Sequence, residues 1–274
     1  MNSNRPVLAT TDGSEHSYRI LPHAAQLADA LGTRLALLSV VDAKEQAQAD
    51  SELRETLSRH GIAGEALTTV TNEGEHVAGA ILRVATEADA AVIALDSRGH
   101  GALRHILHGS VAHDLLRQSD RPLLVSGPNV GDASAAAGPY RIVITNDGSP
   151  ASEAVLHALA PLLTPGRFEL TLLRIHEHAP GGQDESAALA ACEAELAQVR
   201  RLLPESLSVT TLVRTIPLGA GVDTAIIETA RELGAQAIAL STHGVSAREH
   251  VVMGSLATLL LGRSTLPLIL ARAL

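Results

Sequence analysis

Two loops of the chain share a glycine spacing that suits the binding of an anionic group. The segment DSRGHGALRHILHGS spans residues 96–110, and STHGVSAREHVVMGS spans residues 241–255. Each follows a short apolar run and holds a glycine, nine further residues and a Gly-Ser pair ahead of an expected helix. Glycine lets the backbone approach a ligand closely, and the unbonded N–H groups that begin a helix favour an anion. The pattern predicts phosphate binding at both loops.

A second pair of candidates follows the first expected strand of each half. The chain has TTDGS there in one copy, with Thr11 and Asp12, and TNDGS in the other, with Asn146 and Asp147. In an open parallel sheet, ligands bind beyond the carboxyl ends of the strands, where these residues and the glycine loops would converge. Either aspartate could contact a ribose hydroxyl or hold Mg²⁺ against phosphates. Each feature alone is also typical of an ordinary turn or helix cap, and its presence in both halves favours a site.

The elements that must position these residues repeat along the chain. Asp12 and Asp147 lie 135 positions apart, whereas the two glycine loops are displaced by 145, so the second half carries ten extra residues between its second and fourth strands. Short β-like runs alternate with helical patterns in both halves. The strands are expected near 6–11, 34–41, 67–72, 91–95 and 122–126, and again near 141–145, 169–176, 208–215, 236–240 and 267–271.

This alternation predicts an α/β protein of two tandem domains, each a five-stranded parallel sheet with helices on both faces. We expect the domains at 1–127 and 139–274, joined by a small, turn-prone linker over 128–138. Pro22 lies inside the apolar stripe of the first helix, where it should remove a hydrogen bond and bend the helix. In the second half, Ser149 is expected to cap the corresponding helix, with Pro150 at its first position.

Composition excludes several classes of protein. The net charge of −9 and the presence of only three aromatic residues argue against nucleic-acid binding. No apolar stretch approaches the roughly 20 residues of a membrane span, and no secretory leader is evident, so we expect a cytoplasmic protein with no membrane partner. A single cysteine and thirteen scattered histidines give no disulfide framework and no zinc pattern. The one lysine, Lys44, rules out a P-loop.

Both halves resemble domains of the universal stress protein family, whose nucleotide signature is Gly-x2-Gly-x9-Gly-Ser/Thr. The likeness rests on the Asp-Gly-Ser turn, the x9 spacing and the run GSVAHDLLRQSDRPLLVSG from helix into final strand. It implies Rossmann-like, adenine nucleotide alpha-hydrolase-like domains that bind ATP, ADP or AMP, with Mg²⁺ as a candidate companion of the phosphates. The residues that it assigns to the nucleotide are Thr11, Asp12, Val40, Gly99, Gly109, Ser110, Val111 and Ala112, and Asn146, Asp147, Ile175, Gly244, Gly254, Ser255, Leu256 and Ala257.

In that assignment, the residues at the ends of the second strands pack near adenine, and the glycines, serines and following N–H groups receive the phosphates. Both halves depart from the signature at its first glycine, which is Asp96 in one and Ser241 in the other. A carboxylate close to a triphosphate repels it by about 1 kcal/mol or more. Asp96 could instead serve the adenine amino group or a metal. Ser241 is neutral and small, which favours the second-half site.

The sequence therefore predicts a stress-response regulatory protein that binds ATP or another adenine nucleotide in one or both domains. The alternative is an interaction scaffold with decayed nucleotide sites and an unknown protein partner. No residue pattern indicates a catalyst, so we do not expect an enzyme beyond slow ATP hydrolysis. The apolar last strands, near 122–126 and 267–271, are expected to pair with each other and close the chain as a pseudo-dimer, with further homodimerisation open.

Overall fold

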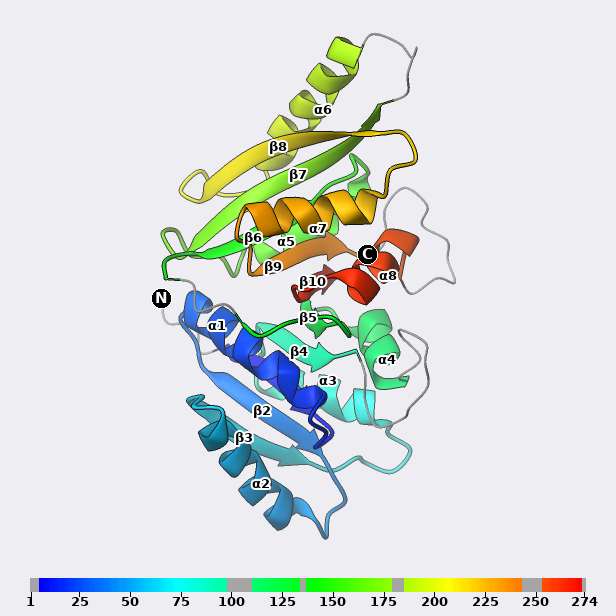
Figure 1. The fold of residues 1–274 in the computed structure, drawn as a ribbon. Coiled ribbons are helices and arrows are strands. Elements are labelled where there is room, and N and C mark those ends of the chain that lie inside the picture. The colour runs from blue at the N-terminus through cyan, green and yellow to red at the C-terminus, as the bar shows by residue number, and fades with distance from the viewer. Residues whose placement is uncertain (1–4, 98–109, 134–136, 179–184, 243–252, 273–274) are drawn as a thin grey trace.

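The computed structural model describes residues 5–97, 110–133, 137–178, 185–242 and 253–272, and only the backbone of Ser110. All ten strands join in one sheet, in the order β3-β2-β1-β4-β5-β10-β9-β6-β7-β8 (Figure 1). The strands are β1 (Val7–Thr11), β2 (Leu35–Val40), β3 (Gly64–Thr69), β4 (Val92–Asp96), β5 (Leu123–Ser126), β6 (Tyr140–Thr145), β7 (Phe168–His178), β8 (Ser208–Pro217), β9 (Ala237–Ser241) and β10 (Leu268–Ala271). Each half contributes five parallel strands, as predicted.

Helices cover both faces of the sheet. They are α1 (Leu21–Leu31), α2 (Gln46–Arg59), α3 (Val77–Glu87), α4 (Ser110–Gln118), α5 (Ala154–Leu159), α6 (Glu185–Arg200), α7 (Val222–Glu232) and α8 (Ser255–Arg263). One core cluster joins the sheet to α1, α2, α5 and α6, and the other joins it to α3, α4, α7 and α8. Successive strand residues alternate between the clusters, because side chains of a strand point to opposite faces. Leu172, for example, belongs to the first cluster and Leu173 to the second.

The two halves meet at an antiparallel pair of strands. β10 pairs with β5 in a register that sets Ile269 against Leu124. Both side chains are fully buried, and together with their neighbours they extend the core across the junction. The predicted pairing of the last strands is therefore present, and it occurs within one chain. Burying these apolar strands removes two sheet edges that would otherwise be open to other chains.

Two local predictions were wrong. The third strand of the first half, expected near 67–72, is Gly64–Thr69, because it pairs residue for residue with Leu35–Val40 of β2. Pro22 does not lie in the interior of the first helix, where it was expected to bend it. A 3-10 turn over Ser17–Ile20 comes first, and α1 begins at Leu21. Pro22 thus lies in the first turn of α1, where its missing N–H would have no helical acceptor.

The cap in the second half agrees with the prediction. Ser149 stands before the 3-10 turn Pro150–Glu153, with extended backbone angles, and Pro150 occupies its first position. The hydroxyl oxygen of Ser149 accepts a hydrogen bond from the N–H of Ser152 at 3.2 Å. Helix α5 follows directly. Ser149 therefore fixes the direction in which the chain leaves the carboxyl end of β6.

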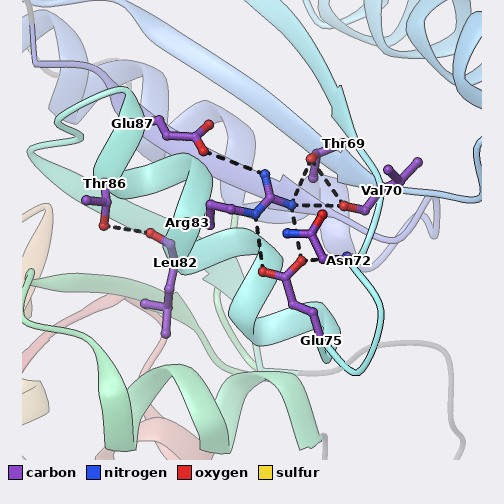
Figure 2. Close-up of polar contacts among 8 residues, drawn as sticks. All are labelled: Thr69, Val70, Asn72, Glu75, Leu82, Arg83, Thr86 and Glu87. Atoms are coloured by element: carbon purple, nitrogen blue, oxygen red, sulfur yellow. Dashed lines mark hydrogen bonds and ion pairs between the residues drawn. The ribbon is translucent and has the colours of Figure 1, made fainter.

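A polar cluster anchors the loop between β3 and α3 in the first half (Figure 2). The Arg83 guanidinium donates to both carboxylate oxygens of Glu75 at 3.2 Å and to the carbonyl oxygen of Val70 at 2.9 Å. Glu75 also accepts from the N–H of Asn72 at 2.8 Å. These hydrogen bonds lower the pKa of Glu75, the bond from Arg83 contributing most. One arginine thus ties the strand end, the loop and the helix together.

The second half makes a similar link with the arginine on the strand. Arg214 on β8 lies 145 positions after Thr69, and it donates to Thr229 at 2.7 Å and to Glu232 at 3.0 Å on α7. The strand supplies the cation here, whereas in the first half the helix supplies it. An arginine therefore holds strand and helix together in both the β3–α3 and the β8–α7 units.

His23 of α1 fixes the start of the linker to the first half. Its side chain is buried, and Nε2 lies 3.0 Å from the carbonyl oxygen of Gly131. A carbonyl can only accept, so Nε2 carries the proton. Burial lowers the pKa of His23 below its ordinary value of 6.5, while the Gly131 carbonyl and the Asp132 carboxylate oppose that shift. The folded protein therefore favours the neutral imidazole.

Acidification is expected to destabilise the fold through His23. Well above pH 6.5 the imidazole is neutral in both states, and below this value the unfolded chain binds a proton that the folded chain resists. The free energy of unfolding in urea should therefore fall between about pH 7.5 and 5. His23→Gln keeps a donor but cannot titrate, so the difference between wild type and variant should change over that range. A difference that is constant with pH would contradict the prediction.

Among the described helices, none is long and apolar enough to cross a membrane. The ten extra residues of the second half lie between its second and third strands. β2 pairs Leu35 with Gly64, and β7 pairs Leu170 with Val209, so the displacement grows from 135 to 145 across this connection. α6 lies in the same connection, and β7 and β8 are longer than β2 and β3. The second half therefore extends further at this edge of the sheet (Figure 1).

Candidate functional site

The Asp-Gly-Ser segments form the same turn in both halves. Oδ1 of Asp12 accepts from the N–H of Ser14 at 3.0 Å and from its hydroxyl at 2.6 Å. Asp147 makes the same two bonds to Ser149, with the same lengths. A tight turn is stabilised when an aspartate side chain accepts a hydrogen bond from the backbone N–H two residues later. Each carboxylate is therefore fixed at the carboxyl end of the first strand of its half.

The residue before each aspartate, Thr11 or Asn146, stabilises the turn through buried hydrogen bonds. Oγ1 of Thr11 shares a 2.6 Å hydrogen bond with the Ser17 hydroxyl and accepts from the N–H of Gly13. In the second half, Nδ2 of Asn146 donates to the Ser152 hydroxyl at 2.8 Å, and its Oδ1 accepts from the Gly148 N–H at 2.9 Å. Both side chains are buried. Their hydrogen bonds show a structural role in each turn.

A cavity of about 290 Å³ opens at the carboxyl ends of the second-half strands. Its lining includes every second-half residue that the sequence assigned to the nucleotide and that the structure describes. These residues are Asn146, Asp147, Ile175, Gly254, Ser255, Leu256 and Ala257. Chain segments as far apart as residues 146 and 257 thus converge on one cavity. This arrangement is expected outside the carboxyl ends of parallel strands.

The amino end of α8 forms one wall of this cavity. Gly254 precedes the helix with extended backbone angles, and its own N–H donates to the carbonyl oxygen of Thr242 at 2.7 Å. The first N–H groups of a helix have no acceptor within it and carry a partial positive charge. No acidic residue lies in the first turn of α8. Ser255, Leu256 and Ala257 therefore present an end of the helix that suits an anion.

Apolar side chains form another part of the lining. Leu173 and Ile175 come from β7, and Val222 and Ile226 come from α7. They belong to, or pack against, the core cluster on the α7 and α8 face of the sheet. An apolar wall beside a helix end suits a ligand with a flat apolar part and an anionic part.

Ser241, the residue at the first signature position of the second half, is buried beside this cavity. Its hydroxyl donates to the carbonyl oxygen of Ser152 and accepts from the N–H of Val155, both at 3.1 Å. The side chain therefore joins the end of β9 to the start of α5. A small, neutral, hydrogen-bonded group at this position leaves the cavity without an added charge.

The first half differs at the corresponding position. Asp96 is 8 % exposed, and its Oδ2 accepts from the Ser126 hydroxyl of the neighbouring strand at 2.6 Å. The residue that corresponds to Ser126 in the second half is Ala271, which has no hydroxyl to donate. Asp96 is thus held toward β5, and it brings a carboxylate to the place where the second half has Ser241.

The remaining predicted residues lie outside the second-half cavity or outside the part of the chain that the structure describes. Gly99, Gly109 and Gly244 lie outside the described residues. Ser110 begins α4, which also contains Val111 and Ala112, and Val40 ends β2, partly buried against the core. In the described part of the chain, no three His, Cys, Asp or Glu side chains gather as a metal site would require.

One charged lining residue was missed by the sequence analysis. Arg174 on β7 lines the cavity, and its Nη2 lies 3.3 Å from Oε2 of Glu195 on α6. The corresponding residue of the first half is Ser39. The signal that could have singled it out is a charged residue between the apolar residues Leu173 and Ile175.

Comparison with known proteins agrees with these observations. The sequence model of the universal stress protein family matches residues 3–126 and again residues 140–272. A universal stress protein from Archaeoglobus fulgidus DSM 4304 has a TM-score of 0.63 at 17% identity, covering 99% of this chain and 97% of that one. A functionally unknown protein from Pseudomonas aeruginosa PAO1 has a TM-score of 0.59 at 15% identity, covering 99% and 94%.

At these identities, the two structures show a shared fold. No curated protein sequence matches the chain. The family model accounts for both halves separately, and both structures cover nearly the whole chain, so the duplication is a property of the fold and not only of the two motifs. The chain belongs to the universal stress protein family, in a tandem two-domain form.

Proposed function

We propose that the second-half cavity binds an adenine nucleotide, which is ATP, ADP or AMP, and that the protein acts as a stress-response regulator through this site. The observation that carries the proposal is that three separate chain segments, which hold the seven assigned residues, converge on one cavity beside the amino end of α8. Family membership supports the ligand class. Mg²⁺ would accompany the phosphates, and we assign no catalytic residue.

The cavity offers suitable partners for the phosphates, the ribose and the adenine of such a ligand. Phosphate oxygens would accept from the first N–H groups of α8 and from the Ser255 hydroxyl. The Asp147 carboxylate, held by Ser149, would accept from the ribose hydroxyls. Adenine would pack against Ile175 and the apolar wall around it.

We propose that this is the main nucleotide site of the chain. In the first half, Asp96 would bring a carboxylate close to bound phosphates, and repulsion at a few ångströms amounts to about 1 kcal/mol or more. This same observation favours a second candidate function for the first half, which is an interaction surface without nucleotide. The two halves would then divide binding and interaction between them.

Two measurements test the proposal. Purified protein is denatured, and any released small molecule is identified by chromatography and mass spectrometry. Thermal unfolding is then followed with added ATP, ADP, AMP and Mg²⁺, because a ligand that binds only the folded state raises its stability. We expect released adenine nucleotide or a concentration-dependent rise in Tm. Neither release nor a rise at millimolar nucleotide would contradict the proposal.

A further inference from the structure

Arg174 occupies a place in the second-half site that no assigned residue accounts for. It follows Leu173 on β7 and lies beside the turn that carries Asp147. Strand alternation puts it on the α5 and α6 face of the sheet, opposite to Ile175. The cavity is therefore bordered by α8 on one side of the strand ends and by Arg174 on the other.

The guanidinium of Arg174 is only partly satisfied. Nη2 pairs with Glu195, but Nη1 is buried and has no hydrogen-bond partner among the described residues. A buried donor without an acceptor is rare in folded proteins and requires an explanation. An oxygen of a ligand in the adjoining cavity would supply that acceptor.

The Asp-Gly-Ser turn of the second half leaves space for the Arg174 side chain because it has a glycine at position 148. A Cβ atom on Gly148 would overlap Nη1 of Arg174 and would lie 2.7 Å from Oε2 of Glu195. Glycine at this position therefore lets the ion pair pack directly against the turn. Gly13 has the same φ of +80°, but a Cβ there would have nothing within 4 Å.

The first half has no counterpart of this arrangement, since Ser39 stands in place of Arg174. Arg174, Glu195 and the close contact with Gly148 thus occur together beside the second-half cavity. Glu195 comes from α6, the helix within the longer β7–β8 connection. Arg174 is consequently a feature of the second half that the first half replaces with serine.

We propose that Arg174 is a specificity-determining residue of this site and donates hydrogen bonds to an anionic group of the bound nucleotide while Glu195 holds it in place. The inference rests on the proposed nucleotide binding. A guanidinium has five N–H donors in a planar fork, so it can serve a carboxylate and a phosphate at once. Arg174 would therefore favour nucleotides over the uncharged nucleoside.

Calorimetric titration of ATP and ligand-detected NMR of adenosine test this assignment. In Arg174→Ser, which installs the first-half residue, we expect ATP to bind about tenfold more weakly or worse. Adenosine should bind as it does to wild type, because it has no anionic group. Arg174→Lys keeps the charge without the fork and should recover part of the lost ATP affinity.

The outcomes separate the two claims. If wild type binds neither ATP nor adenosine, the proposed function fails. If wild type binds ATP and Arg174→Ser binds it equally well, only the role of Arg174 is overturned. The role is also overturned if ATP and adenosine weaken to the same extent, because the arginine would then merely support the site.

A matched glycine pair provides a second test that leaves the arginine in the chain. Gly148→Ala must displace the flexible ends of Arg174 and Glu195, and it should weaken ATP binding as Arg174→Ser does. Gly13→Ala introduces the same backbone strain at φ +80° without a neighbour, and it should leave ATP affinity unchanged. Equal ATP affinities in the two variants would overturn the proposal.

Discussion

Replacing Gly127 with alanine is expected to lower the free energy of unfolding by about 3 kcal/mol or more, because the added methyl group would overlap backbone atoms. Gly127 directly follows β5, and a Cβ there would overlap the backbone carbonyl oxygen of Leu261 on α8. It would also lie 3.1 Å from the carbonyl carbon. Backbone atoms cannot move away by a rotamer change as the end of a side chain can. The backbone at the junction between the halves must therefore shift.

Gly131→Ala is the matched control for this change. Gly131 lies four residues further along the chain, in the linker, and a Cβ there would meet nothing within 4 Å. The free energy of unfolding of Gly131→Ala should differ from that of wild type by no more than about 0.5 kcal/mol. Urea unfolding of both variants beside wild type makes the comparison. Equal midpoints for Gly127→Ala and Gly131→Ala would show that the halves do not approach as closely as described.

Gly254→Val is expected to reduce affinity for ATP by about 100-fold, since losing two charge-assisted hydrogen bonds amounts to about 3 kcal/mol. Gly254 precedes α8 and lines the cavity, so a branched side chain would fill the space nearest the helix N–H groups. Its backbone angles, φ −64° and ψ 163°, are open to valine. The variant should therefore fold normally and bind poorly.

Gly109→Val is the matched control, because Gly109 stands at the corresponding position of the first half. If the second half provides the main site, Gly109→Val should keep wild-type ATP affinity. Calorimetric titration of both variants, with circular dichroism to verify folding, provides the measurement. If Gly109→Val loses ATP binding and Gly254→Val retains it, the main site lies in the first half, and the proposal is contradicted.

The repeat made most of the fold predictable from the sequence. Constant spacings of 135 and 145 between equivalent residues fixed the strand positions of one half from those of the other. The misplaced third strand shows the limit of this approach. Local β-propensity favoured 67–72, but pairing with β2 selected Gly64–Thr69, and neighbouring strands often override propensity in this way. Pro22 was misjudged because the preceding 3-10 turn delays the start of α1.

The candidate site was predictable where it depends on the backbone. Turns and helix starts leave local signals, and the seven assigned residues of the second half do converge. Contacts between side chains distant in sequence left no such signal. Asp96 meets Ser126 only because β4 and β5 are neighbours, and Arg174 meets Glu195 only because α6 packs over β7. These two pairs, which distinguish the halves, required the three-dimensional structure.

Calorimetric titration of ATP with Mg²⁺ into nucleotide-free protein tests the central claim most directly, because it yields the number of sites as well as the affinity. The account predicts one strong site per chain, which Gly254→Val removes and Gly109→Val leaves intact. Absence of binding heat, together with absence of any thermal shift, would contradict nucleotide binding. Two equivalent sites would contradict the asymmetry inferred from Asp96 and Ser241.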